Sequence, residues 1–260
     1  MLSSPQNAKV KLVRALSGRA RERREAGAFL AEGVRLVEEA LLAGWSFRFV
    51  LHSADISERA AQLVARLKQR GTPVDLVDDA LLHSLSETET SQGILAVLEE
   101  HELPLPAAPD FLLIPDSIRD PGNLGTLLRS AEAAGVQAVL LPPESADAFA
   151  PKVVRAGMGA HFRLPIRSAS WTAISVLLGA MPPARQVYLA DMGGASCWEV
   201  DLKPPLALII GGEAAGATAA AREQATRLVS IPMLGGSESL NAAVAGSILM
   251  FEVLRQRSSV

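Results

Sequence analysis

Residues 111–135, FLLIPDSIRDPGNLGTLLRSAEAAG, join an apolar run to an amphipathic segment through a polar turn. The run 111–116 predicts a buried strand, and residues 124–135 have helical spacing and end at a glycine, which commonly stops a helix. The alternation continues, with strands predicted at 138–142, 163–166, 187–191, 206–213 and 228–233 and helices at 148–160, 171–180 and 240–255. Fully apolar strands alternating with helices are typical of a parallel sheet covered on both faces. The sequence therefore predicts an α/β fold with a parallel sheet for residues 111–260.

The first hundred residues predict a smaller α/β domain of their own. Helical spacing and strand-like runs alternate there, with helices at 34–42 and 60–70 and strands at 47–52, 74–77 and 93–100. Residues 102–110, ELPLPAAPD, carry three prolines, which neither a helix interior nor a central strand tolerates. We therefore expect a domain at 1–101, a linker at 102–110 and a second domain at 111–260.

The composition limits the class of protein. Hydrophobic residues make up 49% of the 260 residues and charged residues 20%, so a large buried core is expected. No apolar run reaches the roughly 18 residues of a membrane span, and the N-terminus has no signal-peptide core. A single cysteine, Cys197, excludes an internal disulfide and a thiolate zinc site, and the four histidines are scattered. We expect a cytoplasmic protein with no metal and no membrane segment.

The net charge of −3 conceals a strongly basic segment near the N-terminus. Residues 9–24, KVKLVRALSGRARERR, hold seven basic side chains and one acidic side chain. Such a stretch is typical of a surface that contacts a phosphate backbone. A solvated amphipathic helix without a nucleic-acid partner explains the same pattern and stays an alternative.

Three polar clusters follow predicted strands, and ligands of open α/β sheets usually bind beyond the carboxyl ends of the strands. The first cluster begins with the turn residues 120–123, where Gly122 or Asn123 is expected to cap a helix that starts near Leu124. Capping alone would explain Asn123. A surface salt bridge would explain Arg129, which lies in the same predicted helix.

The second cluster is IIGGEAAGA (209–217), in which two glycines allow the backbone to approach a ligand closely. It lacks the G-x-G-x-x-G fingerprint of dinucleotide sites, and Glu213 is either a surface carboxylate or a group that faces the same cleft. The third cluster is PMLGGSESLNAAVAG (232–246), with four polar residues among the five at 237–241. A helix start needs one cap, so capping alone explains this excess poorly.

The sequence contains no G-x-S-x-G elbow, no Walker loop and no histidine pair at metal-ligand spacing. A reaction without a metal, a thiol or a general-base histidine fits a cofactor that is already activated. A sulfonium methyl donor is such a cofactor, because its leaving group is neutral and the protein mainly has to align the acceptor.

Together the three clusters resemble the three motifs of the SpoU/TrmH family of the SPOUT superfamily, RNA 2′-O-ribose methyltransferases that use S-adenosylmethionine. The resembling segments are DPGNLGTLLRSAEAAG (120–135), LIIGGEAAG (208–216) and IPMLGGSESLNAAVAGSILMFE (231–252). Residues 24–97 resemble the L30e-like domain that binds the RNA substrate in many members. The resemblance implies a deep trefoil knot in the C-terminal domain and a homodimer with the site near the subunit interface.

The resemblance also implies roles for individual residues. Those expected to hold the cofactor are Ala190, Gly211, Ile231, Met233 and Leu240. The expected catalytic and ribose-positioning set is Asn123, Arg129, Glu213, Ser239 and Asn241. The expected RNA contacts, besides the stretch 9–24, are Arg24, Arg35 and Arg155. The family usually assigns the arginine at position 129 to activation of the 2′-hydroxyl. A guanidinium is a poor base at neutral pH, so our hypothesis is that Arg129 stabilises the developing alkoxide.

The resemblance implies methylation of a ribose 2′-hydroxyl in structured RNA, with ribosomal RNA expected because the N-terminal extension is typical of relatives that act on it. A transfer-RNA substrate, or RNA binding without catalysis, is the alternative. A small-molecule or dinucleotide enzyme with a doubly wound sheet is a third alternative, and the missing fingerprint glycines count against it.

Overall fold

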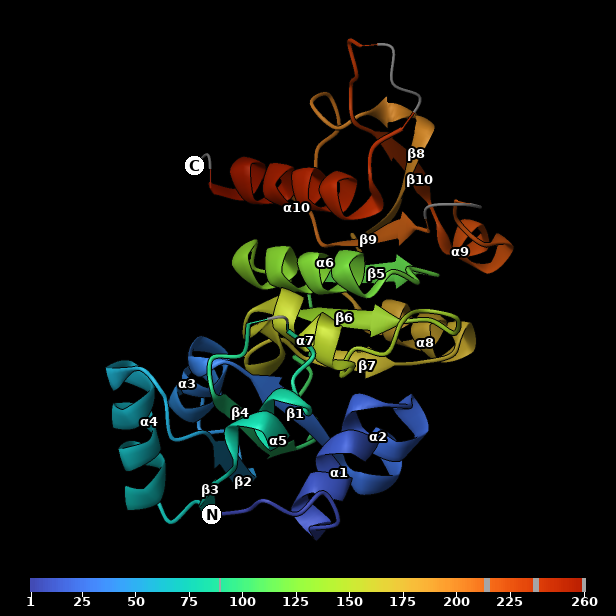
Figure 1. Ribbon diagram of the computed structural model, residues 1–260. Helices are drawn as coiled ribbons and strands as arrows, with labels where there is room; N and C mark the ends of the chain where they lie inside the picture. The colour runs from blue at the N-terminus through green and yellow to red at the C-terminus, as the bar shows by residue number, and fades with distance from the viewer. Residues whose placement is uncertain (89, 213–215, 236–238, 259–260) are drawn as a thin grey trace. The chain divides into compact units, whose positions relative to one another are not determined.

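The computed structural model describes residues 1–88, 90–212, 216–235 and 239–258 of the chain, and Figure 1 shows its helices and strands. The chain divides into two compact units. The first contains Met1–His101 together with Asp147–Phe162, and the second contains Glu102–Ala146 together with Arg163–Val260. Each unit has a sheet of its own.

The first unit is built on a four-stranded mixed sheet in the order β1-β4-β2-β3. Its strands are β1 (Ala28–Glu32), β2 (Phe47–His52), β3 (Val74–Leu76) and β4 (Ile94–Glu99), and only β2 and β3 pair in parallel. Its helices are α1 (Ala8–Ser17), α2 (Ala20–Ala26), α3 (Val34–Leu42), α4 (Glu58–Gln69), α5 (Asp79–His83) and α7 (Pro151–Gly157), and a 3-10 helix follows at Ala160–Phe162.

The second unit contains a six-stranded sheet in the order β10-β8-β9-β5-β6-β7, and every neighbouring pair in it is parallel. The strands are β5 (Phe111–Asp116), β6 (Ala138–Leu141), β7 (Ile166–Ser168), β8 (Gln186–Ser196), β9 (Leu206–Gly211) and β10 (Arg227–Ser230). The helices are α6 (Pro121–Ala133), α8 (Trp171–Ala180), α9 (Ala219–Gln224) and α10 (Ala242–Ser258). The predicted α/β fold with a parallel sheet is confirmed.

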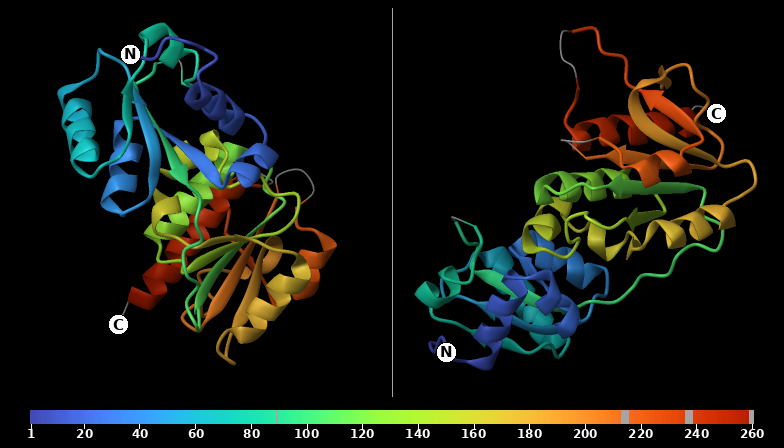
Figure 2. Two further views of the ribbon diagram at one scale, coloured as in Figure 1. Left: turned by 90° about the horizontal axis from the view of Figure 1, so that it is seen from below. Right: turned by 90° about the vertical axis from the view of Figure 1, so that its right-hand side faces the viewer.

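Side-chain alternation along the strands gives this sheet two apolar faces. Leu112 and Ile114 of β5 point to one face with Ile209 of β9, where they pack with Ile174 and other side chains of α8 and α9. The opposite face is covered by α6 and α10, which lie side by side (Figures 1 and 2). Strands buried on both faces explain the continuous apolar runs in the sequence.

Glycine lets α10 pack tightly against α6 and β9. A β-carbon at Gly246 would lie 2.4 Å from Leu127 Cδ2 and 3.2 Å from Ile210 Cγ1. Across the same helix pair, Ser247 Oγ lies 2.8 Å from Ser130 Oγ. The C-terminal helix is therefore held against α6 by close contact as well as by apolar burial.

Several predicted boundaries were wrong, and each error has a local cause. Helix α6 begins at Pro121, and its cap is Asp120, whose side chain accepts a hydrogen bond from Asn123 N at 2.8 Å; neither Gly122 nor Asn123 is the cap. Proline is favoured in the first turn because its φ is already helical. The helix expected at 148–160 is shorter because Met158 adopts a left-handed φ of 48°. The strand expected at 163–166 is displaced to β7, and β1, α5 and α9 were not predicted. The basic segment 9–24, for which a helix was one interpretation, forms most of the two helices α1 and α2.

His161 is a buried titratable group of the first unit. Its Nε2 lies 2.7 Å from the carbonyl oxygen of Ala148, so Nε2 carries the proton, because a carbonyl can only accept. Its Nδ1 is buried with no hydrogen-bond partner among the described residues. Burial lowers the pKa of His161 to about 4, and the bond to Ala148 and the nearby Asp147 offset this only in part.

This pKa predicts that the first unit loses stability in mild acid. Between pH 6.5 and about 4 the unfolded chain binds a proton at His161 and the folded chain does not, so the free energy of unfolding falls as pH falls. The expected slope is about 1.4 kcal/mol per pH unit. Urea denaturation at several pH values measures it, and His161→Phe should flatten the dependence in this window. An unchanged slope in that variant would assign the acid sensitivity to other groups.

Candidate functional site

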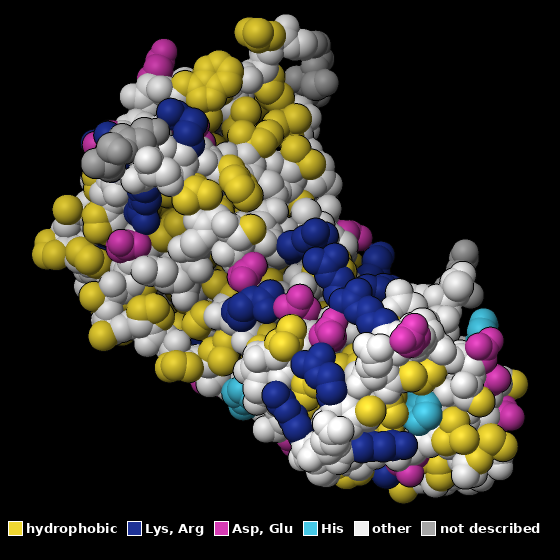
Figure 3. Space-filling view, turned by 90° about the vertical axis from the view of Figure 1, so that its left-hand side faces the viewer, with side chains coloured by type: hydrophobic (Ala, Val, Ile, Leu, Met, Phe, Trp, Pro, Cys, Tyr) yellow, Lys and Arg dark blue, Asp and Glu magenta, His cyan; other side chains and the backbone are white. Residues whose placement is uncertain are grey.

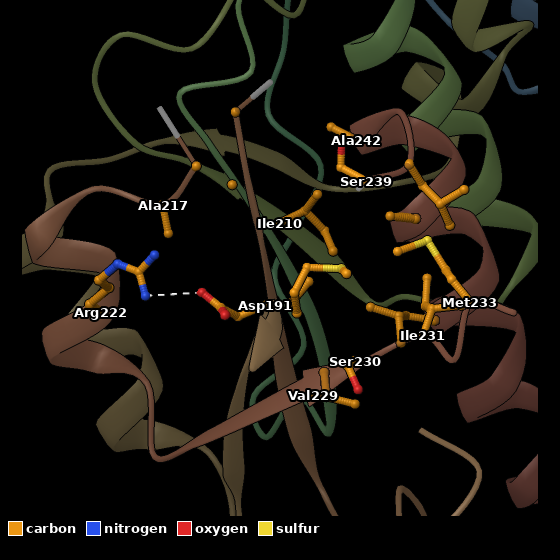
Figure 4. A pocket seen from close by; sticks show the side chains of 18 residues that line it. Asp191, Ile210, Ala217, Arg222, Val229, Ser230, Ile231, Met233, Ser239 and Ala242 are labelled. Atoms are coloured by element: carbon orange, nitrogen blue, oxygen red, sulfur yellow. Dashed lines mark hydrogen bonds and ion pairs between the residues drawn. The ribbon is translucent and has the colours of Figure 1, made fainter. Parts of the chain in front are cut away.

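A pocket opens in the second unit beside the middle of β8 and the carboxyl ends of β9 and β10 (Figure 4). Its volume is about 280 Å³, close to the lower end of the range of roughly 300 to 1,000 Å³ that is typical of ligand pockets. Small and apolar side chains dominate the lining. The lining residues are Ala190, Asp191, Met192, Ile210, Gly211, Gly212, Gly216, Ala217, Arg222, Val229, Ser230, Ile231, Met233, Ser239, Leu240, Ala242, Ala245 and Leu249.

All five positions expected to hold a cofactor lie on the wall of this pocket. Ala190 lies within β8 and Gly211 ends β9. Ile231 and Met233 follow β10, and Leu240 precedes α10. Ser239, expected in the catalytic set, also lines it. The structure thus brings together positions up to 50 residues apart in the chain, from 190 to 240.

The glycines of the second cluster have a structural role that the sequence did not indicate. A β-carbon at Gly211 would lie 2.6 Å from Ala217 N, and one at Gly212 would lie 2.6 Å from the carbonyl oxygen of Ser117. Similarly, a β-carbon at Gly194 would lie 2.5 Å from Val229 N. The space beside these glycines is occupied by the chain itself, so each allows one backbone segment to pass close to another.

Asn241 joins the start of α10 to the start of α6. Its Oδ1 accepts hydrogen bonds from Ala243 N at 2.9 Å and Val244 N at 3.2 Å, which makes it the cap of α10. Its Nδ2 donates to Asn123 Oδ1 at 3.1 Å. Asn241 therefore caps α10 and also contacts Asn123, a second residue of the expected catalytic set. This second contact is a role beyond capping for one of the polar residues at 237–241.

The two roles of Asn241 can be separated by substitution. Asn241→Ala removes both, and loss of the cap is expected to cost about 1 kcal/mol of stability. Serine is also a good cap, so Asn241→Ser should keep most of the stability while its shorter side chain loses the bond to Asn123. Urea denaturation and methyl transfer measure the two effects. Equal activity of Asn241→Ser and the wild type would show that the bond to Asn123 is dispensable.

Arg129 and Glu213 complete the expected catalytic set. Arg129 lies on α6, as Asn123 does, and its side chain is exposed, with no ion pair to another described residue. The alternative of a surface salt bridge is therefore not supported within the described part of the chain. Glu213 lies outside the described residues.

Three charged residues near the pocket were missed by sequence reasoning. Asp116 ends β5, is completely buried, and accepts hydrogen bonds from Thr218 N at 2.7 Å and Thr218 Oγ1 at 3.2 Å. It thereby fixes the start of α9 against the end of β5. Asp191 and Arg222 line the pocket as an ion pair, with Arg222 Nη1 3.1 Å from Asp191 Oδ2. The sequence feature that could have indicated Asp116 and Asp191 is the same for both: each is a single carboxylate at the end of an apolar run.

The basic stretch of the first unit divides into paired and exposed side chains. Lys9 pairs with Asp75, Arg21 with Glu25 and Arg23 with Asp147. The remaining four are exposed and make no ion pair with any described residue: Lys11, Arg14, Arg19 and Arg24. Figure 3 shows a different face of the protein, on which other Lys and Arg side chains lie among Asp and Glu side chains.

The other two arginines expected to contact RNA differ from each other. Arg35 on α3 is exposed, with no ion pair among the described residues. Arg155 on α7 is half-buried, and its Nη1 lies 3.9 Å from Glu87 Oε2. Arg35 is therefore accessible to a ligand, whereas Arg155 is already engaged with a carboxylate.

Among the described residues, no group of three or more His, Cys, Asp or Glu side chains is placed to hold a metal ion. No helix of the described chain has both the length and the hydropathy needed to cross a membrane.

Comparisons with known proteins identify the family of this chain. Residues 110–251 match the SpoU rRNA Methylase family, and residues 7–96 match the MRM3-like substrate binding domain. The 23S rRNA (guanosine(2553)-2′-O)-methyltransferase RlmP of Bacillus subtilis is 36% identical, covering 97% of this chain and 98% of that protein. The 23S rRNA (uridine(2479)-2′-O)-methyltransferase of Streptomyces viridochromogenes is 33% identical, covering 97% and 91%.

Solved structures show the same likeness. The crystal structure of the SpoU methyltransferase AviRb from Streptomyces viridochromogenes in complex with the cofactor AdoMet has a TM-score of 0.88 and 31% identity, covering 98% of this chain and 99% of that one. The AdoMet-bound rRNA methyltransferase from Sinorhizobium meliloti has a TM-score of 0.86 and 31% identity, covering 99% and 98%. Family model, sequence and structure agree over nearly the whole length, and the chain belongs to the SpoU rRNA methylase family.

Proposed function

We propose that the protein transfers a methyl group from S-adenosylmethionine to a ribose 2′-hydroxyl of structured RNA, and that ribosomal RNA is the substrate. The observation that carries the proposal is the pocket beside the middle of β8 and the ends of β9 and β10. Its wall includes Ser239, Leu240 and Ala242, the neighbours of Asn241 in the chain. Asn241 in turn contacts Asn123. This supports a cofactor site next to Asn123, Ser239 and Asn241 of the expected catalytic set.

The lining of the pocket fits this cofactor. Ile231, Met233 and Leu249 offer apolar surface for an adenine ring, and a charged pair and hydroxyl groups offer partners for polar ends. S-adenosylmethionine supplies a methyl group on a sulfonium with a neutral leaving group. The protein then has to orient the ribose, exclude water and stabilise charge on the 2′-oxygen.

We assign those tasks to the expected catalytic residues. Arg129 stabilises the negative charge that develops on the 2′-oxygen, since a guanidinium keeps its proton at neutral pH. Asn123 and Asn241 hold the ribose through amide groups whose mutual hydrogen bond sets their orientation. Ser239, two residues before Asn241, lines the pocket. Glu213 stays a proposed member of the catalytic and ribose-positioning set.

Transfer of labelled methyl groups tests the proposal. The protein is incubated with tritiated S-adenosylmethionine and either ribosomal or transfer RNA, and the product is hydrolysed in alkali, which cannot cleave beside a 2′-O-methyl group. We expect label in an alkali-resistant dinucleotide from ribosomal RNA. Label only from transfer RNA would establish the alternative substrate, and RNA binding without transfer would establish a non-catalytic role.

We propose that the exposed basic side chains of the first unit contact the RNA backbone. Lys11, Arg14, Arg19, Arg24 and Arg35 carry charges that no described carboxylate pairs, which is the state expected of phosphate contacts. Arg155 is proposed as a weaker contributor because of Glu87. The affinity for RNA should fall steeply with salt concentration, and substituting these side chains should reduce that dependence.

We propose that the protein is a homodimer joined through α10. Three large apolar side chains on one side of this helix are exposed, Val244 by 47%, Ile248 by 40% and Phe251 by 46%. Their spacing of four and three residues places them on one face of the helix, opposite the face that packs on α6. Light scattering should give a dimer for the wild type and a monomer for Ile248→Asp. A monomeric wild type would refute the proposal.

Three further proposals concern architecture and location. The linker at 102–110 contains no helix or strand, which supports a domain boundary there, although Asp147–Phe162 packs with the first unit. Close backbone passages at Gly194 and Gly211 support the knot that the family resemblance implies. The proposed place of action is the cytoplasm, where the RNA substrate and the cofactor meet.

A further inference from the structure

The cofactor pocket has a charged end and an apolar end. Among its described lining residues only Asp191 and Arg222 are charged, and they face each other across one side of the cavity. Figure 4 shows this pair on one side, with Ile231 and Met233 on the other. A ligand that fills the pocket would therefore meet apolar surface at one end and one charge of each sign at the other.

The stability of the fold does not account for this pair. The Asp191 side chain is 26% exposed and that of Arg222 is 50% exposed, and ion pairs with this degree of exposure contribute little, about 0 to 1 kcal/mol. Arg222 lies on α9 and Asp191 on β8, so the pair also does not stabilise a single helix. Its position at the pocket is better explained by a ligand.

Both side chains keep capacity for a ligand. Arg222 has five N–H donors, and its side chain makes one hydrogen bond, to Asp191, among the described residues. Asp191 accepts one bond from Arg222 and one from Gly193 N at 3.0 Å, leaving acceptor sites open. The hydrogen bond from Gly193 and the one from Arg222 lower the pKa of Asp191, so its carboxylate is charged at neutral pH.

We propose that Asp191 and Arg222 bind the amino-acid end of S-adenosylmethionine, Arg222 holding the α-carboxylate and Asp191 the α-ammonium. This inference rests on the proposed function, because it takes that cofactor as the ligand. The amino-acid group is a zwitterion, and a paired carboxylate and guanidinium match both of its charges at once. The guanidinium fork also suits a carboxylate geometrically, because two parallel N–H groups can donate to its two oxygens.

Truncated cofactors test this assignment by calorimetry, without any catalytic readout. S-adenosylhomocysteine carries both charged groups, decarboxylated S-adenosylmethionine lacks the carboxylate, and methylthioadenosine lacks the whole amino-acid group. Arg222→Met should weaken S-adenosylhomocysteine about tenfold and leave the other two ligands within about twofold. Asp191→Asn should weaken both ligands that carry the ammonium and spare methylthioadenosine.

A matched control comes from another exposed ion pair of the same unit. Arg163 Nε lies 2.8 Å from Glu132 Oε1, with side chains 43% and 33% exposed, and neither lines the pocket. Arg163→Met should change none of the three affinities. Circular dichroism of every variant checks that the fold is retained.

The possible outcomes are distinct. An equal loss of all three ligands in Arg222→Met or Asp191→Asn would overturn the inference, because it would place these residues against the adenosine part. Unchanged affinities would overturn it as well. If the wild type bound none of the three ligands, the proposed function itself would fail.

Discussion

Replacing Arg129 by alanine is expected to lower kcat for methyl transfer by about 10²–10³-fold, the usual effect of removing one donor that stabilises a developing oxyanion. The affinity for S-adenosylmethionine should change little, because Arg129 is not among the described residues that line the proposed cofactor pocket. The fold should also be retained, since the side chain is exposed on α6 and makes no ion pair with another described residue. Single-turnover methylation and calorimetry measure the two quantities.

A second substitution tells charge from geometry at the same position. Arg129→Lys keeps the positive charge and loses the planar fork. Activity near that of the wild type would mean that charge alone stabilises the 2′-oxygen, and activity as low as in Arg129→Ala would mean that the fork is required. Arg163→Ala, an exposed arginine elsewhere in the same unit, serves as the control and should be fully active. Full activity of Arg129→Ala would refute the proposed role.

Replacing Arg23 by alanine is expected to destabilise the first unit by about 3 kcal/mol, which is typical of breaking a buried ion pair. The Arg23 side chain is only 5% exposed, and its Nη2 lies 2.7 Å from Asp147 Oδ2. Its Nη1 donates to the carbonyl oxygens of Leu16 at 2.7 Å and Gly18 at 3.0 Å. The substitution leaves a carboxylate and two carbonyl groups without this partner.

Arg21, on the same helix α2, provides the matched control. It pairs with Glu25, but the two side chains are 79% and 60% exposed, so Arg21→Ala should change stability by less than about 0.5 kcal/mol. Trp45 is buried in the first unit and reports its unfolding by fluorescence if Trp171 and Trp198 are replaced by phenylalanine. Equal urea midpoints for Arg23→Ala and Arg21→Ala would show that the buried pair contributes nothing.

The parallel sheet could be predicted from sequence because its strands are buried on both faces and therefore stand out as apolar runs. The family could be recognised because its motifs are contiguous in the chain, and the matches confirm it. Helix boundaries were less predictable where two caps compete. Asp120 and Asn123 are both good cap residues, and Pro121 decides between them by favouring a start at its own position.

Contacts between distant segments could not be predicted. Nothing local in Asp147 indicates that it pairs with a residue 124 positions earlier, so the packing of Asp147–Phe162 in the first unit was not foreseen. Asp191 and Arg222 were missed for the same reason. Asp191 lies in the middle of β8 and Arg222 lies on a six-residue helix, and only the fold brings them to the same pocket.

The position of the residues at the start of α10 determines when, during synthesis, the protein can first bind a cofactor. Ser239, Leu240 and Ala242 line the pocket, and Asn241 supplies the bond to Asn123, so the site takes its final groups from the last of the described helices. Translation proceeds from the N-terminus, and the sheet can form before this helix leaves the ribosome. With the cofactor in this pocket, as proposed, a nascent chain with a folded sheet would bind the cofactor only after α10 has docked.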